Sequence, residues 1–495
     1  MRYFSVRVGA VLAVAATLYC AGAGRADDVA VGKGTALLAE GDRLADQGQF
    51  TEAVIRYKRA MEALLPGLRR IPFKHEVKRD VTKRENMKAL ILKEFDEDMT
   101  PEEFRANELA MKVFGLLPPD FNLKDVLAQV YSEEVAAFYD PKTKTMHLIE
   151  ETKSAVKQPP TFLERIFGKK DAFDKDENKT VIAHELTHAL ADQHYDLDAM
   201  QKAVKKDDDR SLALDALIEG EATLAMFGAG MDDWDGDDIT KVPAENLEFT
   251  FKLLSPFLSF LGGGKTLRSV PPIISESMIF PYFQGMVFCA KLTNEGGWAA
   301  IDLVYRNPPL STEQIIHPEK YRAKPDFPTT IDLGLLKPGE GWKEVGRNVL
   351  GEMQMAVLLK KHGGKRAAAG WDGDRYAIFE GPKNRLALVW LSTWDSEDDA
   401  HEFARAYVAY QSAKVGDLGK PPHPIPDSVW RNLDDRLFVV QRRGSNVAVV
   451  EGFSPEATPG LIEAAFQARQ TEAKPADLKQ DGAKTSSAKP LTLAN

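Results

Sequence analysis

The spacing of hydrophobic and polar residues predicts a long helical region followed by a mixed region. Apolar residues recur at helical spacing over 178–194 and 210–227, the two clearest helical segments of the chain. A further helix is expected over 101–114, because a threonine that can cap it precedes the segment and a glycine that can end it follows. Aromatic and β-branched residues on both sides of a Pro-containing turn predict a β-hairpin over 138–149.

The pattern changes after about residue 325, where short alternating segments appear between helical ones. This order predicts a small ββαββα domain over 326–470. The whole chain is therefore expected to be α+β and predominantly helical. The segments of the C-terminal domain are a helix over 344–362, strands over 375–380 and 385–393, a helix over 397–413, strands over 437–441 and 447–451, and a helix over 455–470.

Residues 27–66 form a predicted helical hairpin with a turn at Gly48, and Pro66 is expected to end its second helix. Small and aromatic residues lie at the spacing of a tetratricopeptide unit. A single unit cannot bury its own apolar face, and the chain contains no second copy. Two interpretations remain: a hairpin docked on the next domain, or a surface that binds a protein partner. The residues at that spacing are Gly41, Gly48, Ala53, Tyr57 and Ala60.

The first 26 residues (1–26) have the features of a secretory signal. Arg2 and Arg7 precede an apolar stretch over 8–18, and small residues suit cleavage near Ala26. We therefore expect an exported protein, periplasmic or secreted, with no transmembrane segment in the mature chain. Lipidation at Cys20 is a less favoured alternative.

Composition narrows the possible functions. Asp and Glu number 74 and Lys and Arg 64, an acidic balance that argues against a nucleic-acid binder. The 2 cysteines, Cys20 and Cys289, exclude a disulfide framework and a cysteine-rich zinc module. Residues 471–495 contain no aromatic side chain and are expected to form a disordered tail.

The clearest chemical motif is His-Glu-Leu-Thr-His, within the helix predicted over 178–194. Residues four apart lie on one face of a helix, so His184 and His188 can both reach one metal ion. Glu185 is adjacent to His184 and can act on a metal-activated water without being a ligand. This pattern predicts a zinc site with Glu185 as the catalytic residue.

Catalytic zinc needs a third protein ligand, and two candidates compete. Glu219 lies on the helix predicted over 210–227. His194 has the spacing that metzincins use, but Ala191 stands where those proteins have the glycine that turns the chain. If the helix continues, His194 lies about 240° around it from His188 and faces away. Glu219 is therefore favoured, with a metzincin-like site on His194 as the alternative.

The chain resembles a gluzincin, the zinc metallopeptidase class with a distant glutamate ligand, through this His-Glu-Leu-Thr-His motif and the Glu-Gly-Glu-Ala sequence that starts at Glu219. It also resembles a poorly characterised group of bacterial secreted proteins, over about 69–453. The resemblance implies a zincin-like catalytic core over 67–325. The stretches that resemble the group are 138–145, 184–197, 311–314, 317–321 and 394–396.

The resemblance implies zinc as the metal, a peptide or protein as substrate, and no other cofactor. Zinc on His184, His188 and Glu219 would activate a water molecule, and Glu185 would accept its proton. Related enzymes often have an aspartate four residues after the ligand glutamate. Here that position is Thr223, and Asp215, one turn before Glu219 on the same face, is the alternative that the resemblance suggests for bonding a ligand histidine.

Zincin-type peptidases commonly use a tyrosine or histidine to stabilise the transition state. The candidates downstream of the ligands are Tyr282, His317 and Tyr321, with Tyr305 as a further option. A different class of function also fits the sequence. In that alternative the chain is an envelope interaction or scaffold protein, its zinc is structural or vestigial, and the hairpin over 27–66 binds the partner.

Overall fold

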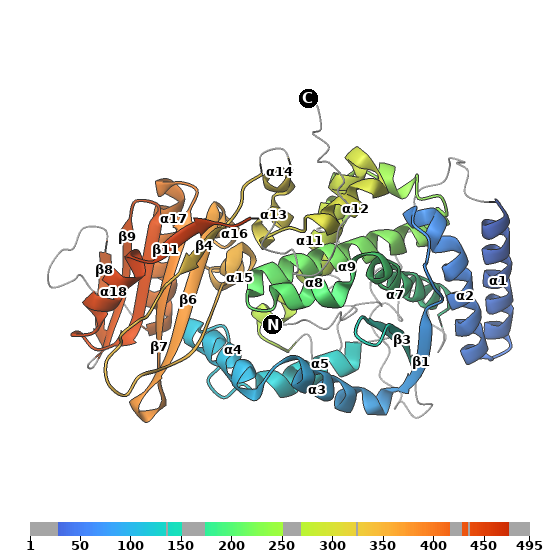
Figure 1. Cartoon of the computed structure of the whole chain (residues 1–495). Coiled ribbons are helices and arrows are strands. Elements are labelled where there is room, and N and C mark those ends of the chain that lie inside the picture. Colours follow the sequence, from blue (N-terminus) through green and yellow to red (C-terminus); the bar gives the residue numbers. More distant parts are fainter. Residues whose placement is uncertain are drawn as a thin grey trace.

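The computed structural model shows a helical body joined to a C-terminal antiparallel sheet, with the N-terminal helices at the opposite end of the molecule (Figure 1). This arrangement confirms the predicted α+β, mostly helical class. The predicted signal segment and Cys20 lie outside the described residues. These are 28–134, 137–150, 174–250, 269–322, 325–415, 428–433 and 436–474.

Helices α1 (Asp28–Asp46) and α2 (Phe50–Arg69) form the predicted hairpin, and α2 packs along helix α7 (Lys175–Tyr195). The hairpin is thus docked on the helical body. The predicted end of the second helix at Pro66 is wrong, because α2 continues to Arg69. Proline removes one backbone hydrogen bond, and the buried ion pair between Arg69 and Glu221 stabilises the last turn in compensation.

The next segment contains β1 (Lys78–Lys83), α3 (Met87–Asp98), α4 (Pro101–Phe114) and α5 (Leu123–Glu134). The bounds of α4 match the prediction. Its Thr100 side chain accepts from the Glu103 N–H, and Gly115 ends it in the left-handed conformation. Both β1 and α3 were missed, because a charged sequence with a weak apolar pattern obscures them.

The predicted hairpin over 138–149 is confirmed as β2 (Ala137–Asp140) and β3 (Thr145–Glu150). It belongs to a three-stranded sheet of order β1-β3-β2, in which β1 is parallel to β3. Strand β2 packs against α7, so this small sheet lies beside the helix that carries the two candidate histidine ligands.

The centre of the body consists of α7, α8 (Leu197–Val204), α9 (Asp208–Gly230), α11 (Pro272–Gly296) and α12 (Trp298–Arg306). Helices α9 and α11 cross in backbone contact, since a Cβ on Gly220 would lie 2.1 Å from the carbonyl carbon of Gly285. By length and composition alone, α11 could cross a membrane. Its apolar window is 67% buried inside the protein, as expected of a core helix.

The remaining short elements lie in both the helical body and the C-terminal region. They are α13 (Thr312–Ile316), α14 (Pro318–Tyr321), β4 (Thr329–Asp332), α16 (Lys365–Ala368) and 3₁₀ turns at Arg84–Asn86, Ile239–Lys241 and Pro382–Asn384.

The C-terminal sheet has six strands in the order β5-β6-β7-β10-β9-β8. The four predicted strands are confirmed as β6, β7, β9 and β10, and the two edge strands were missed. Helices α15 (Gly351–Leu358), α17 (Glu397–Val415) and α18 (Thr458–Phe466) accompany the sheet. The strands are β5 (Lys343–Asn348), β6 (Trp371–Gly381), β7 (Arg385–Trp394), β8 (Ser428–Leu433), β9 (Arg436–Arg443) and β10 (Asn446–Phe453).

The prediction of a single helix over 344–362 is wrong in its first part, which forms edge strand β5. The chain turns at Gly351, whose φ is +72°, where α15 begins. Asp374 on β6 accepts hydrogen bonds from the backbone N–H groups of Leu350 and Gly351, so a distant side chain fixes this turn. Local periodicity does not contain that information.

The predicted start of a disordered tail at residue 471 is also wrong. Strand β11 (Arg469–Glu472) pairs antiparallel with β4, and α18 ends at Phe466. The buried Ala473 donates its N–H to the carbonyl of Pro328. This pairing is nonlocal, so the polar sequence of the segment gives little sign of it. Residues from 475 onward lie outside the described part of the chain.

Helix α4 completes the core of the C-terminal sheet, although it lies in the segment predicted as the catalytic core. Phe114 meets Tyr376 and Trp390 edge-on, with ring centroids 5.3 and 5.2 Å apart. Ala110 and Val113 belong to the same apolar cluster. A division at residue 325 therefore separates elements along the chain, but the sheet shares its core with a helix from before that division (Figure 1).

Candidate metal centre

Two buried helices supply the candidate ligands. Asp174 caps α7 by accepting from the Glu177 N–H, and Asp207 caps α9 by accepting from the Arg210 N–H. Both helices are apolar on most sides beyond their first turns, which is typical of helices buried in a core. Each helix therefore begins at a defined residue, and its candidate ligands lie in the buried part of the helix.

His184, His188 and Glu219 come together at the contact between α7 and α9. The three side chains are buried, with exposed fractions of 4%, 4% and 3%. Glu219 Oε2 lies 3.0 Å from His184 Nε2 and 3.4 Å from His188 Nε2, and the two Nε2 atoms are 3.1 Å apart. This buried group can hold a metal ion.

The separations suit a small tetrahedral ion. Zinc bonds of about 2.0–2.1 Å to nitrogen and oxygen place tetrahedral ligand atoms about 3.3 Å apart. The observed separations of 3.0–3.4 Å lie near that value. Two imidazoles and one carboxylate are also a donor set found in catalytic zinc sites. The residues present therefore fit zinc.

The charge of Glu219 is favoured by its surroundings. Burial raises the pKa of this carboxyl, but His188 and His184 outweigh burial and hold the pKa below its usual range. A deprotonated carboxylate next to two imidazoles is the protonation state that ligation of a cation requires.

Glu185 is completely buried and follows His184 on α7. Adjacent residues are about 100° apart around a helix, so the carboxylate leaves α7 beside the ligand face rather than on it. This placement agrees with a residue that acts next to the metal rather than as one of its ligands.

His194 lies apart from the candidate metal group. Helix α7 continues past Ala191 to Tyr195, as the sequence predicted for a residue that favours helix. His194 Nε2 instead lies 2.8 Å from the carbonyl oxygen of Pro72. Within the described part of the chain, the group that could hold a metal with the two histidines contains Glu219.

Glu221, a second carboxylate on α9 two residues after Glu219, points to the opposite side of the helix. Its two oxygens accept from the Arg69 Nε–H and the Tyr305 hydroxyl. Residues two apart are about 200° apart around a helix, so Glu219 and Glu221 cannot both face the metal. The hydrogen bond from its hydroxyl also fixes the position of Tyr305, one of the candidate transition-state stabilisers, beside Glu221.

Gly220 allows a close helix contact, but not between the two ligand helices. A glycine beside Glu219 could let α9 approach the other ligand helix, α7, closely. The backbone in contact with Gly220 is that of Gly285 on α11. Asp215 and Thr223, the proposed residues behind the ligands, lie one turn before and after Glu219, and both are buried.

Of the candidate transition-state stabilisers, the structure brings Tyr282 to the metal group. Its ring on α11 stacks on His184, with centroids 6.0 Å apart and planes 20° apart. His317 Nε2 lies 3.0 Å from Glu352, and this hydrogen bond raises the pKa of the imidazole. The Tyr321 hydroxyl donates to the carbonyl of Asn307 over 2.6 Å.

Asp192 is a further polar residue beside the candidate site, and the sequence analysis missed it. It accepts from the Tyr139 hydroxyl over 2.6 Å and from Lys144 Nζ over 2.9 Å. These bonds fasten the β2–β3 hairpin to α7 one turn after His188. The sequence could have indicated Asp192, because positions 184, 188 and 192 lie on one face of the helix.

A second group of acidic residues surrounds a lysine. Lys320 Nζ lies 2.7 Å from Glu313 and 3.0 Å from Asp326, and it also bonds Asp395. Burial raises the pKa of Glu313 to about 9. The ammonium group occupies the centre of these carboxylates, so they form an ion-pair cluster between α13, α14 and the end of β7.

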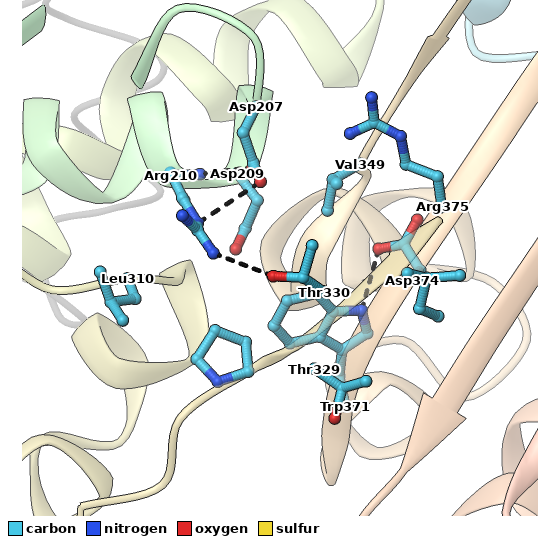
Figure 2. Close-up of a pocket in the computed structure, with 12 residues that line it drawn as sticks. Asp207, Asp209, Arg210, Leu310, Thr329, Thr330, Val349, Trp371, Asp374 and Arg375 are labelled. Atoms are coloured by element: carbon cyan, nitrogen blue, oxygen red, sulfur yellow. Dashed lines mark hydrogen bonds and ion pairs between the residues drawn. The ribbon is translucent and has the colours of Figure 1, made fainter. Parts of the chain in front are cut away.

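A small cavity lies where the first turn of α9 meets the C-terminal sheet (Figure 2). Its volume is about 30 Å³, room for one water molecule rather than a peptide. Arg210 donates to Thr330 Oγ1 over 3.2 Å, and Trp371 donates to Asp374 over 2.9 Å at its edges. The cavity belongs to the contact between the two regions.

Comparison with known proteins gives one match, to the C-terminal part of the chain. A family model described as a domain of unknown function, DUF8575, matches residues 339–461, which include the six-stranded sheet. The searches of curated proteins and of solved structures found no match. The matched residues do not include those of the candidate metal centre.

Proposed function

We propose that this protein is a zinc-dependent metallopeptidase with a zincin-like catalytic core. The observation that supports the proposal best is the buried group of His184, His188 and Glu219. Its histidines belong to a His-Glu-x-x-His motif, and its glutamate comes from a second helix, as in gluzincins. Glu185, which the motif places beside the ligands, gives the site a base that a purely structural zinc would not need.

Each side chain has a defined task in this proposal. When bound, zinc lowers the pKa of a water molecule and polarises the substrate carbonyl. Glu185 takes a proton from the attacking water and later delivers it to the leaving amine. Tyr282, stacked on His184, is the candidate donor to the oxygen that becomes negatively charged.

The substrate proposed is a peptide or an unstructured protein segment outside the cytoplasm. Export is inferred from the N-terminal signal pattern of the sequence. The resemblance to bacterial secreted proteins supports the same compartment.

The test is metal content together with hydrolysis by the purified protein. We expect one zinc per chain, cleavage of casein, loss of cleavage with a chelator, and recovery on adding zinc. Zinc at one per chain without cleavage of casein or other unfolded proteins would contradict the peptidase and favour a scaffold with a structural zinc.

A further inference from the structure

The side of α9 opposite Glu219 is held by a buried polar cluster, which we call the α9 anchor. Arg69 is completely buried and donates from Nε to Glu221, and its guanidinium lies 5.1 Å over the Trp298 ring. Tyr305 donates its hydroxyl to the second oxygen of Glu221. The residues of the anchor are Arg69, Tyr195, Glu221, Asp302 and Tyr305.

The anchor joins both ligand helices. Tyr195 is the last residue of α7, and its hydroxyl donates to Asp302 Oδ1 over 2.7 Å. Arg69 Nη2 donates to the same oxygen over 2.7 Å. The rings of Tyr195 and Tyr305 stack in parallel, 4.3 Å between centroids and 2° between planes. The helix with the histidines and the helix with Glu219 are thus tied to one cluster.

Three consecutive residues of α9 make contacts in three directions. Glu219 faces the imidazoles of α7, Gly220 touches the backbone of α11, and Glu221 faces Arg69 and Tyr305. Successive residues are about 100° apart around a helix, so these contacts together fix its rotation. Turning Glu219 away from the imidazoles would pull Glu221 from its partners and leave buried charges uncompensated.

We propose that the α9 anchor positions the metal centre. Glu221 and Arg69 set the rotation of α9, and Tyr195 with Asp302 holds α7 to the same cluster, so that the Glu219 oxygen meets both imidazoles. Glu221 is therefore a positioning residue and not a ligand. This inference rests on the proposed function only in requiring that the group binds metal.

The C-terminal sheet supplies a matched control. Glu451 is buried like Glu221, with 3% exposed, and it accepts from the Tyr407 hydroxyl over 2.6 Å. Lys414 Nζ lies 3.4 Å from its other oxygen. Glu451→Gln therefore removes a carboxylate with similar partners, far from α9 in the sequence, and its partner Tyr407 lies in a different apolar cluster from Tyr305.

The experiment measures Co²⁺ binding to the full chain of the wild type, Glu221→Gln and Glu451→Gln. The readouts are the dissociation constant, the visible spectrum of bound Co²⁺, and the melting temperature without metal. We expect Glu221→Gln to bind Co²⁺ about 10- to 100-fold more weakly with an altered spectrum, a loss as large as that for residues bonded directly to metal ligands. Glu451→Gln should have a lower melting temperature than the wild type but the same affinity for Co²⁺ and the same spectrum of bound Co²⁺.

Wild-type affinity and spectrum in Glu221→Gln would overturn the inference. Equal losses of affinity in both variants would also overturn it, because the cause would then be general destabilisation. If Glu221→Gln does not fold, Tyr305→Phe is the second variant, because it removes one donor to Glu221. It should bind Co²⁺ several-fold more weakly than the wild type. Unchanged Co²⁺ affinity in Tyr305→Phe would count against the inference.

The outcome for the wild type separates this inference from the proposed function. If Co²⁺ binds with the expected effects but peptides are not hydrolysed, the positioning role of the α9 anchor is supported and the proposed peptidase activity is contradicted. Failure of the wild type to bind Co²⁺ at the His-His-Glu group would overturn both.

Discussion

Glu219 in the helical body and Asp374 in the C-terminal sheet are both buried carboxylates, with 3% and 2% exposed. Their partners differ. Glu219 faces the imidazoles of His184 and His188, which outweigh burial and lower its pKa. Those imidazoles also have nitrogen lone pairs that a metal ion can share. Burial with these partners produces a candidate ligand set.

Asp374 is satisfied by neutral donors instead. It accepts from the backbone N–H groups of Leu350 and Gly351 and from the indoles of Trp371 and Trp390. Burial raises its pKa to about 6 despite these four hydrogen bonds. Its partners offer no further donor atoms to a cation, so this carboxyl fixes the turn before α15. The identity of the partners, rather than burial, separates a chemical site from a structural one.

The largest expected effect follows from removing each carboxylate in turn. Glu219→Ala should lower zinc affinity by more than about 100-fold, beyond the loss typical of residues behind a ligand. Asp374→Ala should destabilise the fold and keep the metal. Zinc per chain, measured after dialysis, checks both variants.

His194→Ala is the matched control on α7, and it should keep zinc because this side chain contacts Pro72. Loss of zinc in His194→Ala with retention in Glu219→Ala would show that the site is metzincin-like.

A smaller effect is expected for the aromatic residues beside the two carboxylates. Tyr282→Phe should retain zinc and lower kcat by about 100-fold, as expected for loss of one donor to the transition state. Trp371→Phe should lower the melting temperature and leave kcat unchanged. Steady-state kinetics at matched zinc content compare kcat in the two variants. Unchanged kcat in Tyr282→Phe would exclude the Tyr282 hydroxyl from the reaction.

The raised pKa of Asp374 predicts a pH dependence of stability. The folded-state pKa of about 6 exceeds the ordinary value of 3.8, so the folded state binds the proton more tightly. The free energy of unfolding should therefore fall by roughly 3 kcal/mol as the pH rises from about 4 to about 6, then level off. Asp374→Asn should lack this component in urea unfolding followed by tryptophan fluorescence. Parallel curves for the two proteins would contradict the assignment.

The smallest expected effect concerns β11. A chain that ends at Gln470 loses the pairing of Thr471 and Glu472 with β4 and the buried Ala473. Its melting temperature should fall by about 2–4 °C relative to a chain that ends at Lys474, with metal content equal in both. Identical melting curves would show that this pairing adds nothing to stability.

Local spacing predicted the parts of the site that lie on one helix. His184 and His188 are four residues apart, so their meeting follows from the helix itself. Glu219 was favoured because the helix phase turns His194 away and because its surrounding sequence is similar to that of gluzincins, and its position beside the histidines agrees with that expectation. The rejection of His194 also followed from local chemistry, because Ala191 favours continued helix.

Contacts between distant segments could not be predicted in this way. Arg69 and Glu221 are 152 residues apart, and nothing in either sequence window indicates their pairing. The partner of Gly220 is likewise set by the packing of α11. Strand β5 was assigned to a helix, because its turn depends on Asp374 from a later strand. These features depend on tertiary packing, which hydrophobic periodicity does not describe.

The most direct test of the central claim measures zinc content and casein hydrolysis in the same preparation of Glu185→Gln. The ligands are intact in this variant, so we predict one zinc per chain. Hydrolysis should fall by about 10²- to 10⁴-fold, because the proton acceptor is lost. Hydrolysis at the wild-type rate with zinc bound would contradict the role of Glu185 and the mechanism built on it.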